Sequence, residues 1–191
     1  MAKQKLIFIM LVFVFSSSVF AQDSVIDTSK IQRKARWVRK KYAKYPTTLA
    51  NRLVRNYNDD ASKVIAISYW ISKNIKYDVK ALQSGSYFRK TSNEVLKSKK
   101  AMCGEYAILF NEMCESVGVY SERVGGYTKK FDLFPEDHLY RAEHAWSVVD
   151  IQNKWELMDL TWAAGYLKPK KQYVEKILWV LLTRPYKIKW K

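Results

Sequence analysis

Cysteine and histidine are scarce in this chain of 191 residues, which has two of each. They show no spacing typical of metal ligands, so we expect no metal site. Cys103 and Cys114 lie eleven residues apart on one predicted helix. Their Cα atoms are then roughly 16 Å apart, whereas a disulfide needs less than about 7 Å. We therefore expect two free thiols, with Cys114 in the core and a different role for Cys103.

The chain also lacks internal repeats and any linker rich in proline, glycine or serine, and it has only one long apolar run. That run, at positions 6–15, follows Lys3 and Lys5 and precedes the small residues Val19 and Ala21. Such a pattern is typical of a signal peptide over residues 1–21, although an uncleaved anchor is the alternative. No cysteine lies directly after the run, at the position of a cleavage site, so a lipoprotein is not expected. We predict an exported protein, either periplasmic or extracellular.

Acidic residues are few, with 18 against 34 lysines and arginines, and the net charge is +16. Eight cations fall within fifteen residues that contain no acid: Lys30, Arg33, Lys34, Arg36, Arg39, Lys40, Lys41 and Lys44. Such a cluster attracts polyanions, and for an exported protein this favours an envelope polymer or anionic lipid over nucleic acid. The alternative is a solvated surface with no partner.

Hydrophobic periodicity predicts helices in the first part of the chain and strands in the second. Helices are expected over residues 28–44, 49–57, from 60 onward, before 97, and from 103 to about 118. Strands are expected over residues 121–128, 144–151, 154–162 and 173–183, with a polar loop over 129–141. This order predicts an α+β fold. We divide the mature chain into a basic helical extension, 22–58, and one domain, 59–191.

The sequence around Cys103, His144 and Asp159 predicts local structure that could bring a thiol, an imidazole and a carboxylate together. If Gln152 and Asn153 form a two-residue turn, His144 faces Thr161 across the hairpin, and Asp159 is the diagonal neighbour of His144. Diagonal neighbours lie about 7–8 Å apart, within reach of a side-chain contact. Cys103 is expected at a helix N-terminus, where the helix dipole and free amides lower a thiol pKa. These are the parts of a nucleophilic acyl-transfer site, whereas His138 shows no such pattern and is expected to be a surface residue.

The segments AISYWISKNIKYD, SKKAMCGEYAILFNEMCESVGV, RVGGYTK and EHAWSVVDIQNKWELMDLTWAAG resemble the transglutaminase-like superfamily of papain-like cysteine enzymes. The subgroup they resemble most is the kyphoscoliosis-peptidase-like domains. The resemblance covers about residues 60–183 and implies a papain-like core with the nucleophile at a helix N-terminus. It implies Cys103 as nucleophile, His144 as general acid and base, and Asp159 as the residue that orients His144. Ala101 and Met102 depart from the pattern, because a glycine two residues before the cysteine is common.

The resemblance implies acyl transfer through a thioester, with a peptide or side-chain amide as donor. Water as acceptor would make the protein a protease or amidase, and an amine would make it a transglutaminase. Tyr106, Trp146 and Trp162 are candidates for the acyl-binding groove, with core packing as the alternative. Calcium sites are not evident, so no cofactor is expected. Two other functions stay open: a catalytically idle binding or scaffold module at the envelope, and a basic adaptor that docks through residues 30–44.

Overall fold

The computed structural model describes residues 26–38, 40–85, 89–127, 142–168 and 172–175. Helical elements in the first part are α2 (Thr28–Arg36), η1 (Lys40–Tyr42), α3 (Pro46–Val54), α4 (Asp60–Asn74), α5 (Val79–Ser84), α6 (Ser92–Ser98) and α7 (Cys103–Glu115). Two short strands, β1 (Lys76–Tyr77) and β2 (Lys100–Ala101), pair in parallel among them. The second part holds β3 (Ser121–Gly126), β4 (His144–Ile151), β5 (Lys154–Met158), α8 (Leu160–Ala164), β6 (Gly165–Lys168) and β7 (Gln172–Glu175).

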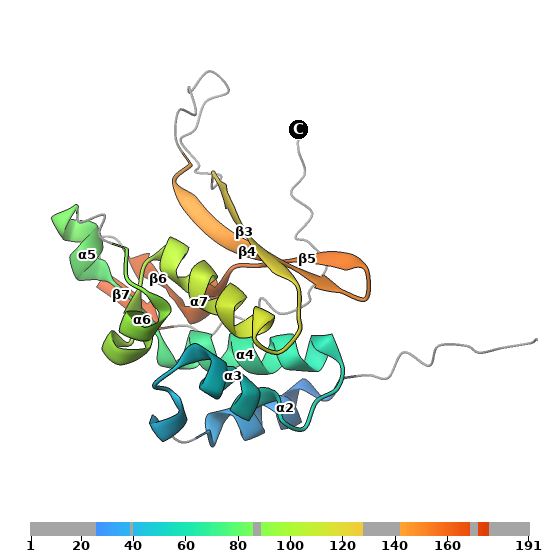
Figure 1. Cartoon of the computed structure of the whole chain (residues 1–191). Coiled ribbons are helices and arrows are strands. Elements are labelled where there is room, and N and C mark those ends of the chain that lie inside the picture. Colours follow the sequence, from blue (N-terminus) through green and yellow to red (C-terminus); the bar gives the residue numbers. More distant parts are fainter. Residues whose placement is uncertain (1–25, 39, 86–88, 128–141, 169–171, 176–191) are drawn as a thin grey trace, which may run out of the picture.

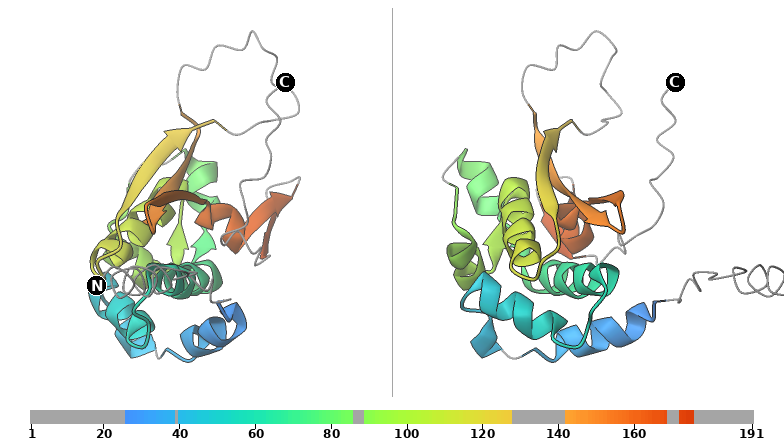
Figure 2. Two further views of the ribbon diagram at one scale, coloured as in Figure 1. Left: turned by 90° about the vertical axis from the view of Figure 1, so that its right-hand side faces the viewer. Right: turned by 45° about the vertical axis from the view of Figure 1, so that its right-hand side comes forward.

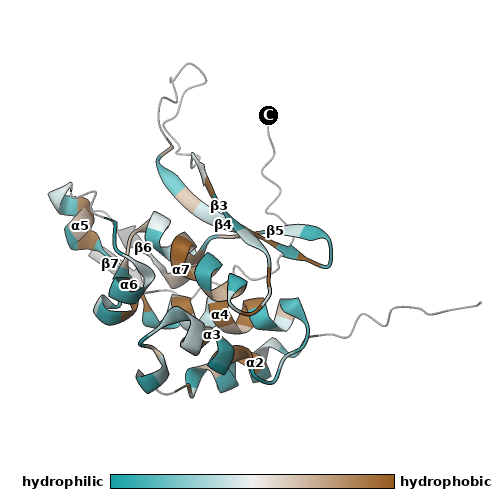
Figure 3. Cartoon of the chain, in the orientation of Figure 1, coloured by the Kyte–Doolittle hydropathy of each residue, from teal (hydrophilic) through white to brown (hydrophobic). Residues whose placement is uncertain are grey.

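Helix α7 lies between the antiparallel sheet β3–β4–β5 on one side and α3 and α4 on the other (Figures 1 and 2). α2 packs beneath α4, and its buried Ile31 and Ala35 belong to the same core as Leu109 and Phe110 of α7. Figure 3 shows hydrophobic positions gathered on α4 and α7, where the helices meet. This arrangement confirms the predicted α+β fold, with helices packed against an antiparallel sheet.

Local sequence explains where the central helices begin. The carboxylate of Asp59 accepts a hydrogen bond from the backbone N–H of Ser62 at 2.7 Å and so caps α4. Thr91 and Glu94 form a reciprocal capping box at the start of α6. These caps satisfy amide groups that have no partner within the helix, and they fix the first turn.

The hairpin of β4 and β5 has the predicted turn. Ile151 pairs with Lys154, and Gln152 and Asn153 both adopt positive φ, 55° and 62°. Two such residues are typical of the turn whose twist matches a two-stranded hairpin, and asparagine tolerates this conformation well. In β4, Ala145, Ser147, Val149 and Ile151 are buried, so every second side chain faces α7 and the core.

Several predicted boundaries are wrong. The first helix ends at Arg36 rather than residue 44, and the second covers Pro46–Val54 rather than 49–57. Proline is suited to the first turn of a helix, so Pro46 opens α3 as well as separating it from the preceding segment. β5 ends at Met158 rather than 162, because the chain turns into α8. Helix α5 was not predicted.

Some predictions concern residues outside the described ranges. They are the signal peptide at 1–21, Arg39, His138 with the loop around it, and the last strand beyond residue 175. Among the described residues, no helix combines the length and apolar character needed to span a bilayer. The predicted division at residue 58 stays a prediction.

Candidate active site

His144 and Asp159 are in direct contact. Nε2 of His144, the first residue of β4, lies 2.8 Å from Oδ2 of Asp159. The other carboxylate oxygen, Oδ1, accepts a hydrogen bond from the backbone N–H of Trp162 at 3.0 Å. Asp159 therefore caps α8 with one oxygen and holds the imidazole with the other, which fixes the carboxylate in position.

The predicted contact between these two residues is present, but its local structure differs from the prediction. The strand pairing ends with Ser147 opposite Met158, so His144 does not face Thr161 in a ladder. Instead the chain leaves the sheet after Met158, and Asp159 is the N-cap of α8. The motif Asp-x-Thr-Trp is thus the start of a short helix rather than the end of a strand.

Cys103 meets the His144–Asp159 pair from the N-terminus of α7. Its sulfur forms a hydrogen bond with the His144 side chain and accepts hydrogen bonds from the backbone N–H groups of Ala145 and Gly104. Because Nε2 of His144 is held by Asp159, the nitrogen available to Cys103 is Nδ1. Sulfur, imidazole and carboxylate are therefore in sequential contact.

The contacts favour opposite charges on the thiol and the imidazole. Burial opposes the thiolate, but the hydrogen bonds from His144, Ala145 and Gly104 outweigh it and lower the pKa of Cys103. Burial likewise opposes the imidazolium, but hydrogen bonds to Asp159 and Cys103 raise the pKa of His144 to about 9. At neutral pH this arrangement favours a thiolate–imidazolium pair. In contrast, burial raises the pKa of the Cys114 thiol, which is fully buried in the core.

Two tryptophans flank the imidazole. The ring of Trp162 stacks on His144 with centroids 5.6 Å apart, and the ring of Trp146 is 5.4 Å away at an angle of 43°. Trp146 also lies against Gly126, where an added Cβ would come within 2.8 Å of the indole. Glycine at position 126 thus allows Trp146 its place beside His144. Tyr106, by contrast, is a core residue: it is 1% exposed and its hydroxyl donates to the carbonyl of Ile75.

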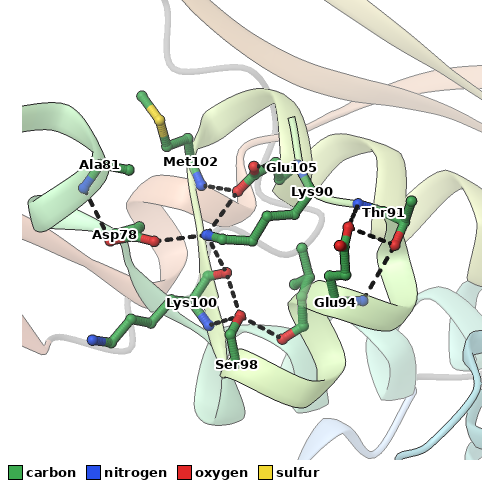
Figure 4. A network of polar contacts seen from close by, with 10 residues as sticks. Asp78, Ala81, Lys90, Thr91, Glu94, Ser98, Lys100, Met102 and Glu105 are labelled. Atoms are coloured by element: carbon green, nitrogen blue, oxygen red, sulfur yellow. Dashed lines mark hydrogen bonds and ion pairs between the residues drawn. The ribbon is translucent and has the colours of Figure 1, made fainter. Parts of the chain in front are cut away.

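An ion-pair network that was not predicted supports the start of α7 (Figure 4). The ammonium of Lys90 lies 2.6 Å from Asp78 and 3.5 Å from the buried Glu105, and it donates to the carbonyl of Lys100. The carboxylate of Glu105 in turn accepts hydrogen bonds from the backbone N–H groups of Lys90 and Met102, each with an N–O distance of 2.8 Å. Met102, the residue immediately before Cys103, is therefore held by the carboxylate of Glu105, and the ammonium of Lys90 balances the charge of that carboxylate.

Sequence offered a partial signal for this network. Glu105 stands three residues after Met102, which is the glutamate position of a capping box. Nothing in the sequence pattern associates Lys90 with Asp78 or Glu105.

Replacing Lys90 by methionine is expected to lower the free energy of unfolding by about 3 kcal/mol, because it leaves Asp78 and Glu105 buried without a counterion. Urea unfolding measures the change. The matched control is Lys63→Met, which breaks the more exposed pair with Asp60 and should cost less than about 1 kcal/mol. Equal losses in the two variants would contradict the role given to the network.

Tyr77 is a second residue near the site that was not predicted. It pairs with Ala101 in the β1–β2 ladder, two residues before Cys103. Burial, together with the charges of Cys103, Glu105 and Asp78, raises the pKa of Tyr77 to about 12. The phenol therefore remains a neutral O–H group at neutral pH.

These features define a class of protein: an α+β fold in which a cysteine at a helix N-terminus meets a histidine at the start of a strand, and a carboxylate at the N-cap of a later helix holds that histidine. Residues 47–160 match the family model described as the transglutaminase-like superfamily, and the chain belongs to this superfamily.

Similar proteins include the kyphoscoliosis peptidases of Mus musculus and Homo sapiens, each 34% identical over 119 residues. They support the predicted subgroup. The match covers 61% of this chain but 18% of each relative. Among solved structures, a candidate protease from Parabacteroides distasonis ATCC 8503 has 18% identity and a TM-score of 0.49, over 69% of this chain and 25% of that one.

Proposed function

We propose that this protein is an exported cysteine enzyme that transfers an acyl group from a peptide or side-chain amide through a thioester on Cys103. The observation that carries the proposal is the chain of contacts from the Cys103 sulfur through the His144 ring to the Asp159 carboxylate. Cysteine enzymes require this order of groups, because the thiolate is the nucleophile and its basic partner must be oriented.

In the acylation step the Cys103 thiolate attacks the amide carbonyl and forms a carbon–sulfur bond. The carbonyl oxygen becomes negative, and the backbone N–H of Cys103, at the first position of α7, is the proposed group that stabilises it. As the carbon–nitrogen bond breaks, the His144 imidazolium gives its proton to the departing amine. The products are a thioester on Cys103, a free amine and a neutral imidazole.

The second step releases the acyl group. Water or an amine attacks the thioester and loses a proton to His144, the carbon–sulfur bond breaks, and the thiolate–imidazolium pair forms again. Water yields a carboxylic acid, as in a protease or amidase, and an amine yields a new amide, as in a transglutaminase. Asp159 keeps the imidazole in position through both steps and stabilises its charged form.

The proposed location is outside the cytoplasm, on the basis of the N-terminal sequence. The cations around α2 support a polyanionic partner there, because the side chains of Lys30, Arg33, Lys34, Arg36, Lys41 and Lys44 are exposed. Retention on cell envelopes should then fall as salt is raised. Neutralising these six side chains should remove the retention, and unchanged binding would contradict the proposal.

The function is tested by trapping the acyl-enzyme. The protein is incubated with envelope extract, quenched in acid and digested, and the peptide containing Cys103 is analysed by mass spectrometry. The expected result is an acyl adduct on Cys103, with a mass that identifies the donor, and none in the His144→Ala variant. If Cys103 carries no adduct with any extract or amide probe, the catalytically idle scaffold is the better account.

A further inference from the structure

The outward face of the β3–β4–β5 sheet carries a continuous apolar stripe. Strand register places Val124 beside Trp146, Val148 beside Leu157, and Trp155 beside Asp150. The ring of Tyr120, which precedes β3, packs edge-on against Trp155 with centroids 5.6 Å apart. We call these six residues the apolar stripe: Tyr120, Val124, Trp146, Val148, Trp155 and Leu157.

The stripe is not part of the core. The alternate residues of β4, including Ser147 and Val149, are buried on the opposite face of the sheet. Tyr120 is 59% exposed, and Trp155 and Leu157 are each 51% exposed. Single exposed apolar residues are ordinary on a protein surface, but a contiguous row of them is typical of a binding surface.

The stripe begins at the candidate active site. Trp146 shares its face of β4 with His144, and their rings are in contact. From His144 to Asp150 the strand advances by six residues, which is roughly 20 Å. A peptide in extended conformation would cover the same distance with about six residues. The stripe thus has the length and position of a subsite for the chain that flanks a reactive amide.

The charges on this face of the sheet indicate which kind of ligand it could bind. In the three described strands the outward positions carry Glu122 and Asp150 and no lysine or arginine, although the whole chain has 34 of these cations. Oδ1 of Asp150 is buried, and no described residue forms a hydrogen bond with it. The two carboxylates repel an anionic polymer and attract a cation, so an apolar segment that ends in a cation fits this face.

We propose that the apolar stripe binds the acyl donor as an extended peptide, with apolar side chains next to the reactive amide and a lysine or arginine about six residues away, near Asp150. This inference rests on the proposed function and specifies its substrate. Burying Trp155 and Leu157 against apolar side chains supplies the affinity. The carboxylate of Asp150 selects the register of the peptide.

The proposal is tested first without catalysis. Cys103→Ala protein is titrated into two fluorescent peptides of eight residues that share a glutamine and a terminal lysine, one with leucine and phenylalanine between them and one with serine. We expect the apolar peptide to bind more tightly than the serine peptide. Adding Trp155→Ser and Leu157→Ser should weaken the affinity for the apolar peptide roughly 10- to 100-fold. Trp37→Ser, which removes another exposed indole, is the matched control and should change nothing.

The result that would overturn the proposal is equal binding of the two peptides, or equal loss in the control. A dimer that dissociates in the double variant, with peptide binding unchanged, would show instead that the stripe joins two copies of this chain. Asp150→Asn should weaken binding of the apolar peptide, and it should leave unchanged the binding of the same peptide with alanine in place of its terminal lysine. These outcomes are independent of the proposed function, which fails separately if neither peptide acylates Cys103 in the wild-type protein.

Discussion

The His144→Ala variant is expected to acylate Cys103 roughly 10²- to 10⁴-fold more slowly than the wild-type protein, the range that a positioned general acid or base contributes. Two losses combine. The leaving amine no longer receives a proton from the imidazolium, and Cys103 loses the hydrogen bond and the nearby positive charge that lower its pKa. The rate of adduct formation with an activated amide or ester measures the change.

The chain provides its own control for this experiment. Cys114 is a free thiol on the same helix, fully buried, and its pKa is raised by burial. Alkylation of Cys114 in the folded protein should be slow in both forms, so any rise in its labelling would report unfolding of the variant. If Cys103 reacts at the same rate with and without His144 while Cys114 stays protected, the imidazole has no catalytic role.

The Asp159→Asn variant is expected to shift the alkaline limit of activity to lower pH. In the wild-type protein the His144 imidazolium donates its proton up to a pH of about 9, where it titrates. The hydrogen bond to the Asp159 carboxylate is the largest contribution that raises this pKa, so an amide in its place lowers the pKa. The rate near neutral pH should also fall, by as much as about 10⁴-fold, because the amide does not maintain the orientation and charge of the ring.

A second substitution at this position separates catalysis from stability. Asparagine can still accept the Trp162 N–H and cap α8, whereas alanine cannot. Asp159→Ala should therefore lose about 1 kcal/mol of helix-cap stability beyond Asp159→Asn, with a similar loss of activity. Two variants with the same pH profile as the wild-type protein would show that Asp159 serves only as a cap.

The same pair links pH to folding. The pKa of His144 is raised from 6.5 to about 9, so its contribution to stability is fully present below pH 6.5 and is lost as the pH rises through about 9. Urea unfolding across this window should show the decrease in the wild-type protein and a smaller one in Asp159→Asn.

Sequence was sufficient to predict the fold class and the His144–Asp159 contact for identifiable reasons. The alternation of β4 and the turn at Gln152 and Asn153 set the hairpin register, and register decides which side chains share a face. It could not show that β5 ends at Met158, because the apolar pattern continues through Leu160 and Trp162 while the backbone is already helical.

Contacts between distant elements were also beyond the sequence. Lys90 contacts both carboxylates because the parallel β1–β2 pair places Asp78, which follows β1, close to the start of α7, which follows β2 and contains Glu105. Trp146 and Trp162 were candidates for the groove together with Tyr106, and their spacing could not separate them. Burial does so, because Tyr106 is enclosed in the core and Trp162 is half exposed beside His144.

The pH dependence of Cys103 alkylation in the wild-type protein tests the central claim most directly. Iodoacetamide is applied across pH 4 to 11, and the rate constant is followed by mass spectrometry of the Cys103 and Cys114 peptides. We expect Cys103 to react rapidly at neutral pH, with a titration below the ordinary thiol pKa of 9.0 and a second change near pH 9 as His144 loses its proton. A single titration at or above pH 9, with Cys103 no more reactive at pH 7 than an unperturbed thiol, would contradict the thiolate–imidazolium pair and the enzyme built on it.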